Sequence, residues 1–295
     1  MKKLPVIAIW IDTIITAVNM VVAAYAVEYA SAALFLLFAS LGATLCFIPH
    51  VTRIHAWNRV FDRKYIWRYV GIGTLSTALP MTIMVYALNF TTPTNASILN
   101  QFEIIYSLLL AWILLREIPS WRQLGGSALI IGGVTLLLWQ AGYSPQLKGD
   151  LMIIGCLWMF QLSHILAKKL PTDLDGQTIA CVRSLFAMPA LFLLIIYIAV
   201  SQGLTFNPTP TLWGCVFFSA IFCYYIGNSL WYYGIRNMAL GKATAIILSY
   251  PVFTFVLSVI LGLDKITTLK TLGLIFALSG AYIVTLVPTK GETEA

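Results

Sequence analysis

The sequence predicts an all-α integral membrane protein of ten transmembrane helices, arranged as two inverted repeats of five helices each. Three observations predict this fold: the composition, the lengths of the apolar runs and an internal repeat. Hydrophobic residues make up 60% of the 295-residue chain, charged residues make up 10%, and the mean hydropathy is +0.87. A soluble domain carries about 25% charged residues, so this chain has too little polar surface to face water on all sides.

Ten stretches of the chain are long enough to cross a bilayer, which takes about 20 mostly apolar residues. The first five are Pro5–Val27, Ala30–Pro49, Trp67–Phe90, Pro93–Leu115 and Trp121–Trp139. After a polar break at Ser144–Lys148, the second five are Gly149–Ala167, Gly176–Val200, Pro210–Ile235, Lys242–Leu263 and Leu269–Val287. The first run is too long for the apolar core of a signal peptide, and no cleavage site follows it, so it counts as a span. We expect the two repeats to cover 1–143 and 144–295.

Basic residues predict the orientation of these helices, because loops rich in lysine and arginine stay in the cytoplasm. With the amino terminus inside, the inner segments hold fourteen of the 18 basic residues, and the outer segments hold Lys148, Lys265 and Lys270. The remaining basic residue, Arg183, lies within a span. We therefore expect cytoplasmic termini and a location in the cell (inner) membrane. The net charge of +7 forms no basic stripe, so nucleic acid is not an expected partner.

Motifs that would indicate an enzyme or a cofactor are missing from the sequence. It has no Walker loop, no dinucleotide fingerprint, no HExxH and no GxSxG. The cysteines form no CxxC and have no histidine at metal-ligand spacing, and all of them lie in apolar runs, at Cys46, Cys156, Cys181, Cys215 and Cys223. We therefore expect no cofactor, no metal, no enzymatic activity and no ATP-driven pumping by this chain.

An internal repeat relates the two halves of the chain. A constant offset of 147 over spans three to five matches Tyr86 with Tyr233, Ala96 with Ala243, Ser97 with Thr244, Glu117 with Asp264, Gly126 with Gly273 and Gly133 with Gly280. In the first span of each half, Trp10 matches Trp158 with one residue more. Because each repeat holds an odd number of spans, the second must be inserted upside down. Inverted repeats are typical of secondary transporters.

These residues resemble the drug/metabolite transporter superfamily, specifically its ten-helix members with two EamA domains. The resemblance covers nearly the whole chain and rests on Trp10, Trp158, Ala96-Ser97, Ala243-Thr244, the run Tyr250-Pro251-Val252-Phe253 and the acids Glu117 and Asp264 with the glycines that follow them. It implies a central cavity lined by spans one to four and six to nine, with spans five and ten at the periphery. The motifs specify the fold and leave the substrate open.

The chain departs from the usual pattern of that superfamily at several positions. Ile104 stands where the first half usually has proline, and Ile11 and Met159 stand where glycine often follows the tryptophan. The arginine of the second span is absent. These departures leave the membership intact and weaken any transfer of individual residue roles.

Glu103 is the candidate for the centre of the site, because an ionisable side chain at membrane depth needs a reason to be there. It is the eleventh residue of its span, which places it about 16 Å into the membrane. Asn100 and Ser107 lie three residues before and four after it, on the same helix face. One hypothesis is that Glu103 binds a substrate cation or exchanges protons. The alternative is that a protonated Glu103 joins two helices through a hydrogen bond.

Two further spans carry polar stripes at helical spacing. Asp12, Thr16 and Asn19 form the stripe of the first span, and Trp158, Gln161 and His164 form that of the sixth. A stripe that faces a cavity is favoured over one that faces lipid, although His164 also fits a packing role. Arg183 lies seven residues from its cytosolic end, so it could extend to the interface or pair with Asp12 or Glu103.

The eighth span places Tyr224, Asn228 and Trp231 on one face, too deep in part for an interfacial aromatic belt. Aromatic faces beside a carboxylate favour organic cations and ring-bearing substrates. The offset of 147 also makes Tyr250 the counterpart of Glu103, and Pro251 next to it predicts a kink.

The sequence thus predicts a secondary transporter, an exporter of an amino acid or organic cation, which works by alternating access with or without proton coupling. The expected partners are a small-molecule substrate, the bilayer and, as a coupling ion, protons; a monomer and a homodimer both fit. Alternatives are a multidrug or nucleoside/purine-type transporter, a channel, an intramembrane enzyme and a receptor. The candidate substrate-binding residues are Glu103, Asn100, Asp12, Asn19, Trp158, Gln161, His164, Tyr224, Asn228 and Tyr250.

Overall fold

The structure, a computed structural model, describes residues 3–87, 90–91, 96, 98–139, 146–201, 203–261 and 265–287. Within these residues every named element is a helix, which confirms the all-α prediction, and the one bridge between extended residues joins Ala30 to Phe206. Some residues named in the sequence analysis lie outside the described part, namely Pro93, Ser97, Ser144, Leu263 and Asp264.

The first half of the chain forms four long helical rods, one short helix and, at its end, a fifth long rod. The rods are α1 (Leu4–Ala26), α2 (Ala32–Arg53), the continuous series α4 (Ile66–Gly73), η1 (Thr74–Ala78) and α5 (Leu79–Ala87), and the series η2 (Asn100–Phe102), α7 (Glu103–Leu110) and η3 (Ala111–Leu115). The short α3 (Trp57–Val60) follows α2, and the half closes with α8 (Trp121–Trp139). The segments η1 and η3 are π-helical, and η2 is a 3₁₀ turn.

The second half forms five rods in the same order. They are α9 (Leu147–Lys168), α10 (Gly176–Ser201), the series α11 (Pro210–Phe218), η4 (Ser219–Gly227) and α12 (Asn228–Asn237), the pair α13 (Leu240–Ile247) and α14 (Tyr250–Ile260), and α15 (Thr268–Thr285). The segment η4 is π-helical. The break between α13 and α14 falls directly before Tyr250 and Pro251, where the sequence predicts a kink.

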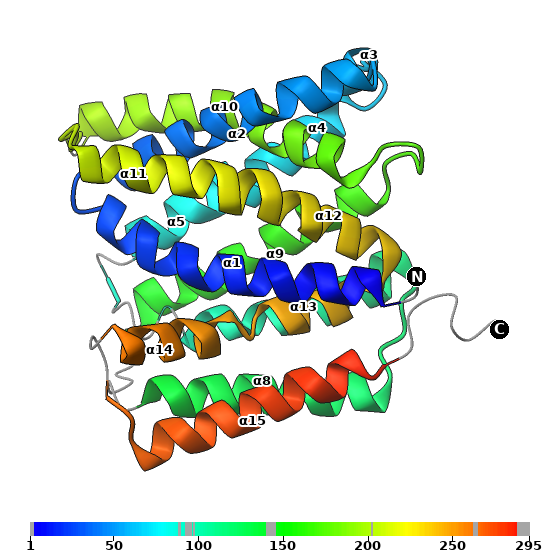
Figure 1. Cartoon of the computed structure of the whole chain (residues 1–295), viewed down its shortest axis with the longest axis vertical. Coiled ribbons are helices and arrows are strands. Elements are labelled where there is room, and N and C mark those ends of the chain that lie inside the picture. Colours follow the sequence, from blue (N-terminus) through cyan, green and yellow to red (C-terminus); the bar gives the residue numbers. More distant parts are fainter. Residues whose placement is uncertain are drawn as a thin grey trace.

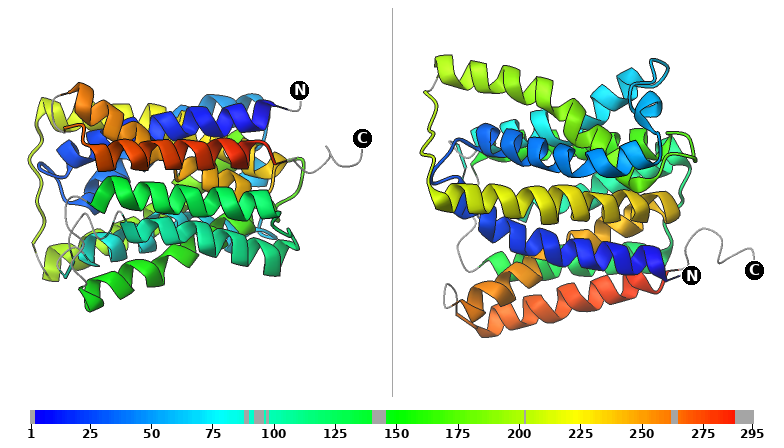
Figure 2. Two further views of the ribbon diagram at one scale, coloured as in Figure 1. Left: turned by 90° about the horizontal axis from the view of Figure 1, so that it is seen from below. Right: turned by 45° about the horizontal axis from the view of Figure 1, so that its top comes forward.

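Seven helical stretches in the described part of the chain are long and apolar enough to cross a membrane. They coincide with seven of the ten predicted spans, the exceptions being the third, fourth and fifth. The fourth corresponds to the shorter apolar helix Asn100–Leu115, and the third and fifth correspond to helical residues 66–87 and to α8. The rods lie side by side, and α1 begins at the end of the bundle where α15 finishes (Figures 1 and 2).

Local sequence signals explain several helix ends. Pro5 lies in the first turn of α1, where a missing N–H removes no helical bond. Thr209 caps α11, because its side chain accepts a hydrogen bond from the Leu212 N–H at 3.2 Å. Proline does not always end a helix here: the second span was predicted to stop at Pro49, but α2 continues to Arg53. The fixed φ of proline is compatible with a helix, so Pro49 removes one hydrogen bond without ending α2.

The helices α8 and α15 pack against each other along one edge of the bundle (Figure 1). They correspond to spans five and ten, which the resemblance places at the periphery. The remaining rods surround a core of buried apolar side chains, among them Ile9, Phe47, Tyr69, Ile104 and Ile246. The polar residues discussed below lie among these rods.

Candidate functional site

A hydrogen-bonded network joins both halves of the chain at Glu103. The Glu103 Oε1 atom accepts a hydrogen bond from Gln161 Nε2 at 2.6 Å. Thr244 Oγ1 donates to Gln161 Oε1 at 3.4 Å and accepts from Ser107 Oγ at 2.8 Å. The network therefore links α7 of the first half to α9 and α13 of the second. Gln161, Ser107 and Thr244 are fully buried, and Glu103 is partly exposed.

Asn100 and Tyr250 meet beside this network. The Asn100 Nδ2 atom lies 3.5 Å from Tyr250 Oη, at the limit of a hydrogen bond. Tyr250 is the first residue of α14, so the helix break before Pro251 positions its ring. Tyr250, the pseudo-symmetric counterpart of Glu103, thus meets a residue that lies one helical turn before Glu103.

Asp12 and Asn19 of α1 both face the π-helical segment η4. The Oδ1 atom of Asp12 lies 2.6 Å from the position that a Cβ on Gly227 would occupy. Asn19 Oδ1 accepts a hydrogen bond from Ser219 Oγ at 2.7 Å. The Asp12 side chain is 4% exposed, and its carboxylate makes no hydrogen bond within the described residues. The predicted polar stripe of the first span therefore faces the bundle interior.

Arg183 points into the bundle instead of extending to an interface. Its Nη1 donates to Asn228 Oδ1 at 2.9 Å and its Nε donates to Thr77 Oγ1 at 3.3 Å. Its Nη2 donates to the carbonyl oxygen of Ser76 at 3.3 Å. No carboxylate of the described residues lies within ion-pairing distance of its guanidinium, although its charge acts on both Asp12 and Glu103. Arg183 therefore forms no ion pair with Asp12 or Glu103, the two pairings that the sequence left open.

The remaining candidates divide between packing and exposure. His164 packs edge-on against the Trp231 ring with centroids 4.9 Å apart, and its Nδ1 is buried without a hydrogen bond to any described residue. Tyr224 is buried within η4. Trp158 is 38% exposed, and no hydrogen bond or ring contact within the described residues joins it to the other candidates. The polar residues predicted to share one face of the sixth span therefore do not act together: Gln161 joins the network around Glu103, and Trp158 does not.

Sequence reasoning missed several polar residues near this cluster. Ser76 and Thr77, which accept from Arg183, lie in the π-helical η1. Gln101 is fully buried, and neither its Oε1 nor its Nε2 has a hydrogen-bond partner in the part of the chain that the structure describes. Ser76 and Thr77 could have been noticed in the sequence, because they are adjacent hydroxyl residues within an apolar span. Single π-helical turns occur often at functional sites, but no periodicity in the sequence indicates them.

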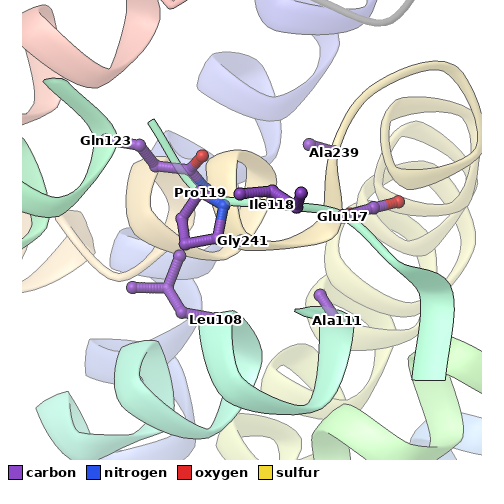
Figure 3. A pocket seen from close by; sticks show the side chains of 8 residues that line it. All are labelled: Leu108, Ala111, Glu117, Ile118, Pro119, Gln123, Ala239 and Gly241. Atoms are coloured by element: carbon purple, nitrogen blue, oxygen red, sulfur yellow. The ribbon is translucent and has the colours of Figure 1, made fainter. Parts of the chain in front are cut away.

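A small pocket lies away from these residues, where the α7 rod ends and α8 begins (Figure 3). Its lining residues come from that connection and from the link between α12 and α13; they are Leu108, Ala111, Glu117, Ile118, Pro119, Gln123, Ala239 and Gly241. Glu117 Oε1 forms an ion pair with Lys168 Nζ at 2.8 Å, and Glu117 Oε2 accepts from the Leu240 N–H at 2.7 Å. Lys168 also donates to the Met238 carbonyl oxygen at 2.7 Å. This set ties the first half to the second.

Comparison with known proteins gives a consistent result. The model of the EamA-like transporter family matches residues 3–139 and again residues 147–286. An uncharacterized transporter of Methanothermobacter thermautotrophicus is 24% identical over 215 residues, which cover 71% of this chain and 62% of that protein. A probable terminal-alkyne amino-acid exporter of Streptantibioticus cattleyicolor is 25% identical over 159 residues, or 53% of this chain and 52% of that protein.

The fold also has a counterpart among solved structures. One protein of known crystal structure superposes with a TM-score of 0.79 and covers 95% of this chain and 96% of its own. Its sequence identity of 16% supports the fold alone.

Proposed function

The chain belongs to the EamA-like transporter family, and from this premise we propose that it is a secondary transporter that exports a small metabolite, an amino acid or an organic cation. Export by alternating access needs a binding site shared by two halves that can rock against each other. The observation that carries the proposal is the network of Glu103, Gln161 and Thr244, because it joins the two halves through polar side chains inside an apolar bundle.

The proposed architecture is ten transmembrane helices in two inverted repeats, 1–143 and 144–295. Two separate matches to one family model, over 3–139 and 147–286, support these repeats. Seven qualifying spans and three further helical rods support the number. The basic residues favour cytoplasmic termini and the cell (inner) membrane. The polar cluster is built within one chain, so both a monomer and a homodimer suit the proposal.

The proposed substrate site consists of the polar residues around Glu103 and Arg183. Asp12 and Glu103 supply negative charge for an ammonium group, and Asn100, Asn228 and Tyr250 supply neutral hydrogen-bonding groups. Tyr224 adds an aromatic face. The similarity to a probable amino-acid exporter supports an amino acid among the substrate classes. In this proposal Glu103 also carries the proton if export is coupled to a proton gradient.

Uptake into proteoliposomes tests this function. Purified protein would be assayed with labelled amino acids, organic amines and nucleosides, with and without an imposed proton gradient. We expect saturable uptake of at least one amino acid or amine, and acceleration by unlabelled substrate on the opposite side, which alternating access requires. Uptake that grows linearly with concentration at channel-like rates would contradict the proposal, as would the transport of nucleosides alone.

A further inference from the structure

Arg183 holds a positive charge inside the bundle, and its hydrogen-bond partners among the described residues are all neutral. It is the eighth residue of α10, about 10 Å along that helix. Its three hydrogen bonds go to Asn228, Thr77 and the Ser76 carbonyl oxygen. Ser76 and Thr77 belong to η1, and Asn228 belongs to α12. Residues of η1 and α12 therefore orient the guanidinium that α10 carries. None of the three acceptors carries a formal charge.

The guanidinium also keeps donors for a further ligand. Arginine has five N–H groups, and the three hydrogen bonds use one from each of its nitrogens. One N–H group on each terminal nitrogen lies outside these three bonds, and the buried Tyr232 hydroxyl is a neutral neighbour of the same guanidinium. Two N–H groups on the terminal nitrogens of one planar guanidinium suit a carboxylate or another planar anion better than a single-point contact.

The carboxyl groups of Asp12 and Glu103 are close enough to interact electrostatically with Arg183 but do not pair with it. Within the described residues, Glu103 bonds to Gln161 and the Asp12 carboxylate makes no hydrogen bond. The site thus leaves the guanidinium and the two carboxyl groups unpaired with one another, although pairing would have reduced the free-energy cost of burying charge. An isolated buried charge is favourable only when something neutralises it, and a substrate with charges of both signs would neutralise each.

We infer that Arg183 binds an anionic group of the substrate, and that the substrate class is therefore zwitterionic amino acids instead of simple organic cations. This inference rests on the proposed transport function and chooses between its two substrate classes. An amino acid would place its carboxylate against Arg183 and its ammonium group towards Asp12 and Glu103. A cation without a carboxylate would be repelled by Arg183 and would leave its N–H groups without an acceptor.

The test compares each amino acid with the amine formed by its decarboxylation. Labelled L-phenylalanine, L-leucine, L-tryptophan and L-alanine would be assayed in proteoliposomes against phenethylamine, isopentylamine, tryptamine and ethylamine. We expect the wild-type protein to transport at least one amino acid about tenfold or more faster than its paired amine. Arg183→Gln should bring that ratio close to one by slowing the amino acid, and Arg183→Lys should retain part of it, because it keeps the charge without the planar fork.

Arg236→Gln is the matched control, because within the described residues Arg236 donates to the backbone carbonyl oxygens of Ala167 and Pro171 and to no side chain. Its transport ratio should equal that of the wild type. Size-exclusion profiles and thermal unfolding would establish that each variant is folded, and Arg183→Lys keeps the test decisive if Arg183→Gln does not fold. Preference of the wild type for amines, or an unchanged ratio in Arg183→Gln, would overturn the inference and leave the transport function standing. If folded wild-type protein moved neither class above protein-free liposomes, the proposed function itself would fail.

Discussion

Gly126 of α8 and Gly280 of α15 lie backbone to backbone. A Cβ atom on Gly126 would come within 2.8 Å of the Gly280 carbonyl oxygen, and one on Gly280 within 2.5 Å of the Gly126 carbonyl oxygen. Gly133 approaches the Gly273 carbonyl oxygen in the same way, at 2.6 Å. The offset of 147 makes Gly126 the counterpart of Gly273 and Gly133 the counterpart of Gly280. Gly126 therefore contacts the counterpart of Gly133, and Gly133 contacts the counterpart of Gly126. A two-fold axis between two repeats produces this reciprocal pattern.

Alanine at Gly133 should destabilise the protein, whereas alanine at the adjacent Gly132 should not. The added methyl group at 133 meets the α15 backbone, and overpacking of this kind costs about 1–3 kcal/mol. At Gly132 no atom of the described residues lies within 4 Å of the added atom, so the better helix propensity of alanine should stabilise the protein by about 0.5–1 kcal/mol. Thermal unfolding in detergent would measure both. Equal melting temperatures would show that α8 and α15 do not pack this closely.

The variant Glu103→Gln should lose transport while remaining folded. Glutamine has nearly the same shape and can still accept a hydrogen bond from Gln161, but it cannot attract an ammonium group or carry a proton. We expect the initial rate to fall about tenfold or more, as for loss of a buried charged contact. Glu28→Gln, at an exposed position near the end of α1, is the control and should be unaffected. Normal transport by Glu103→Gln would favour the alternative that Glu103 joins helices only.

Two buried amides should respond to replacement by methionine in opposite ways. Gln101 and Gln161 are both fully buried, but among the described residues Gln101 has no hydrogen-bond partner, whereas Gln161 bonds to Glu103 and Thr244. Removing an unsatisfied polar group relieves a penalty of about 1–3 kcal/mol, so Gln101→Met should raise the melting temperature. Gln161→Met should lower it, because Glu103 and Thr244 lose their partner. A lower melting temperature for Gln101→Met would mean that Gln101 has a partner in solution, such as water.

The positions of most helices follow from the sequence because bilayer thickness fixes the length of an apolar run. Boundaries followed less well: α2 passes Pro49, since a helix can extend beyond the apolar core of the membrane. The π-helical segments η1 and η4 could not be predicted, because one extra residue in a turn leaves the apolar pattern of a fully hydrophobic rod unchanged. For the same reason the sequence did not indicate that Ser76 lies in a π-helical segment.

Within the candidate site, residues on one helix could be grouped from spacing, but contacts between helices could not. Glu103 and Ser107 join one network, as their four-residue separation predicts. The partners of Arg183 are 45 to 107 residues away in sequence, and only the packing of the rods brings them together. The repeat offset related Glu103 to Tyr250 but did not indicate that Tyr250 would contact Asn100.

The ion pair between Glu117 and Lys168 should hold one end of the bundle closed. Their side chains are 9% and 13% exposed, and removal of one partner of a buried pair costs about 3–5 kcal/mol because it leaves the other charge unpaired. We therefore expect Lys168→Met to destabilise the protein strongly, and the double variant Lys168→Met with Glu117→Gln to recover part of the loss. A double-mutant cycle from thermal unfolding gives the coupling energy between the two residues.

The same pair predicts a functional effect, because alternating access would require this end of the bundle to open. A cysteine at position 239, which lines the adjacent pocket, would report opening through its rate of labelling by a water-soluble maleimide after the native cysteines are replaced. Lys168→Met should raise that rate, whereas Lys169→Met should not, since no ion pair of Lys169 lies within the described residues. Strictly additive stabilities together with equal labelling rates would show that the Glu117–Lys168 pair neither couples the two halves nor controls access at this end.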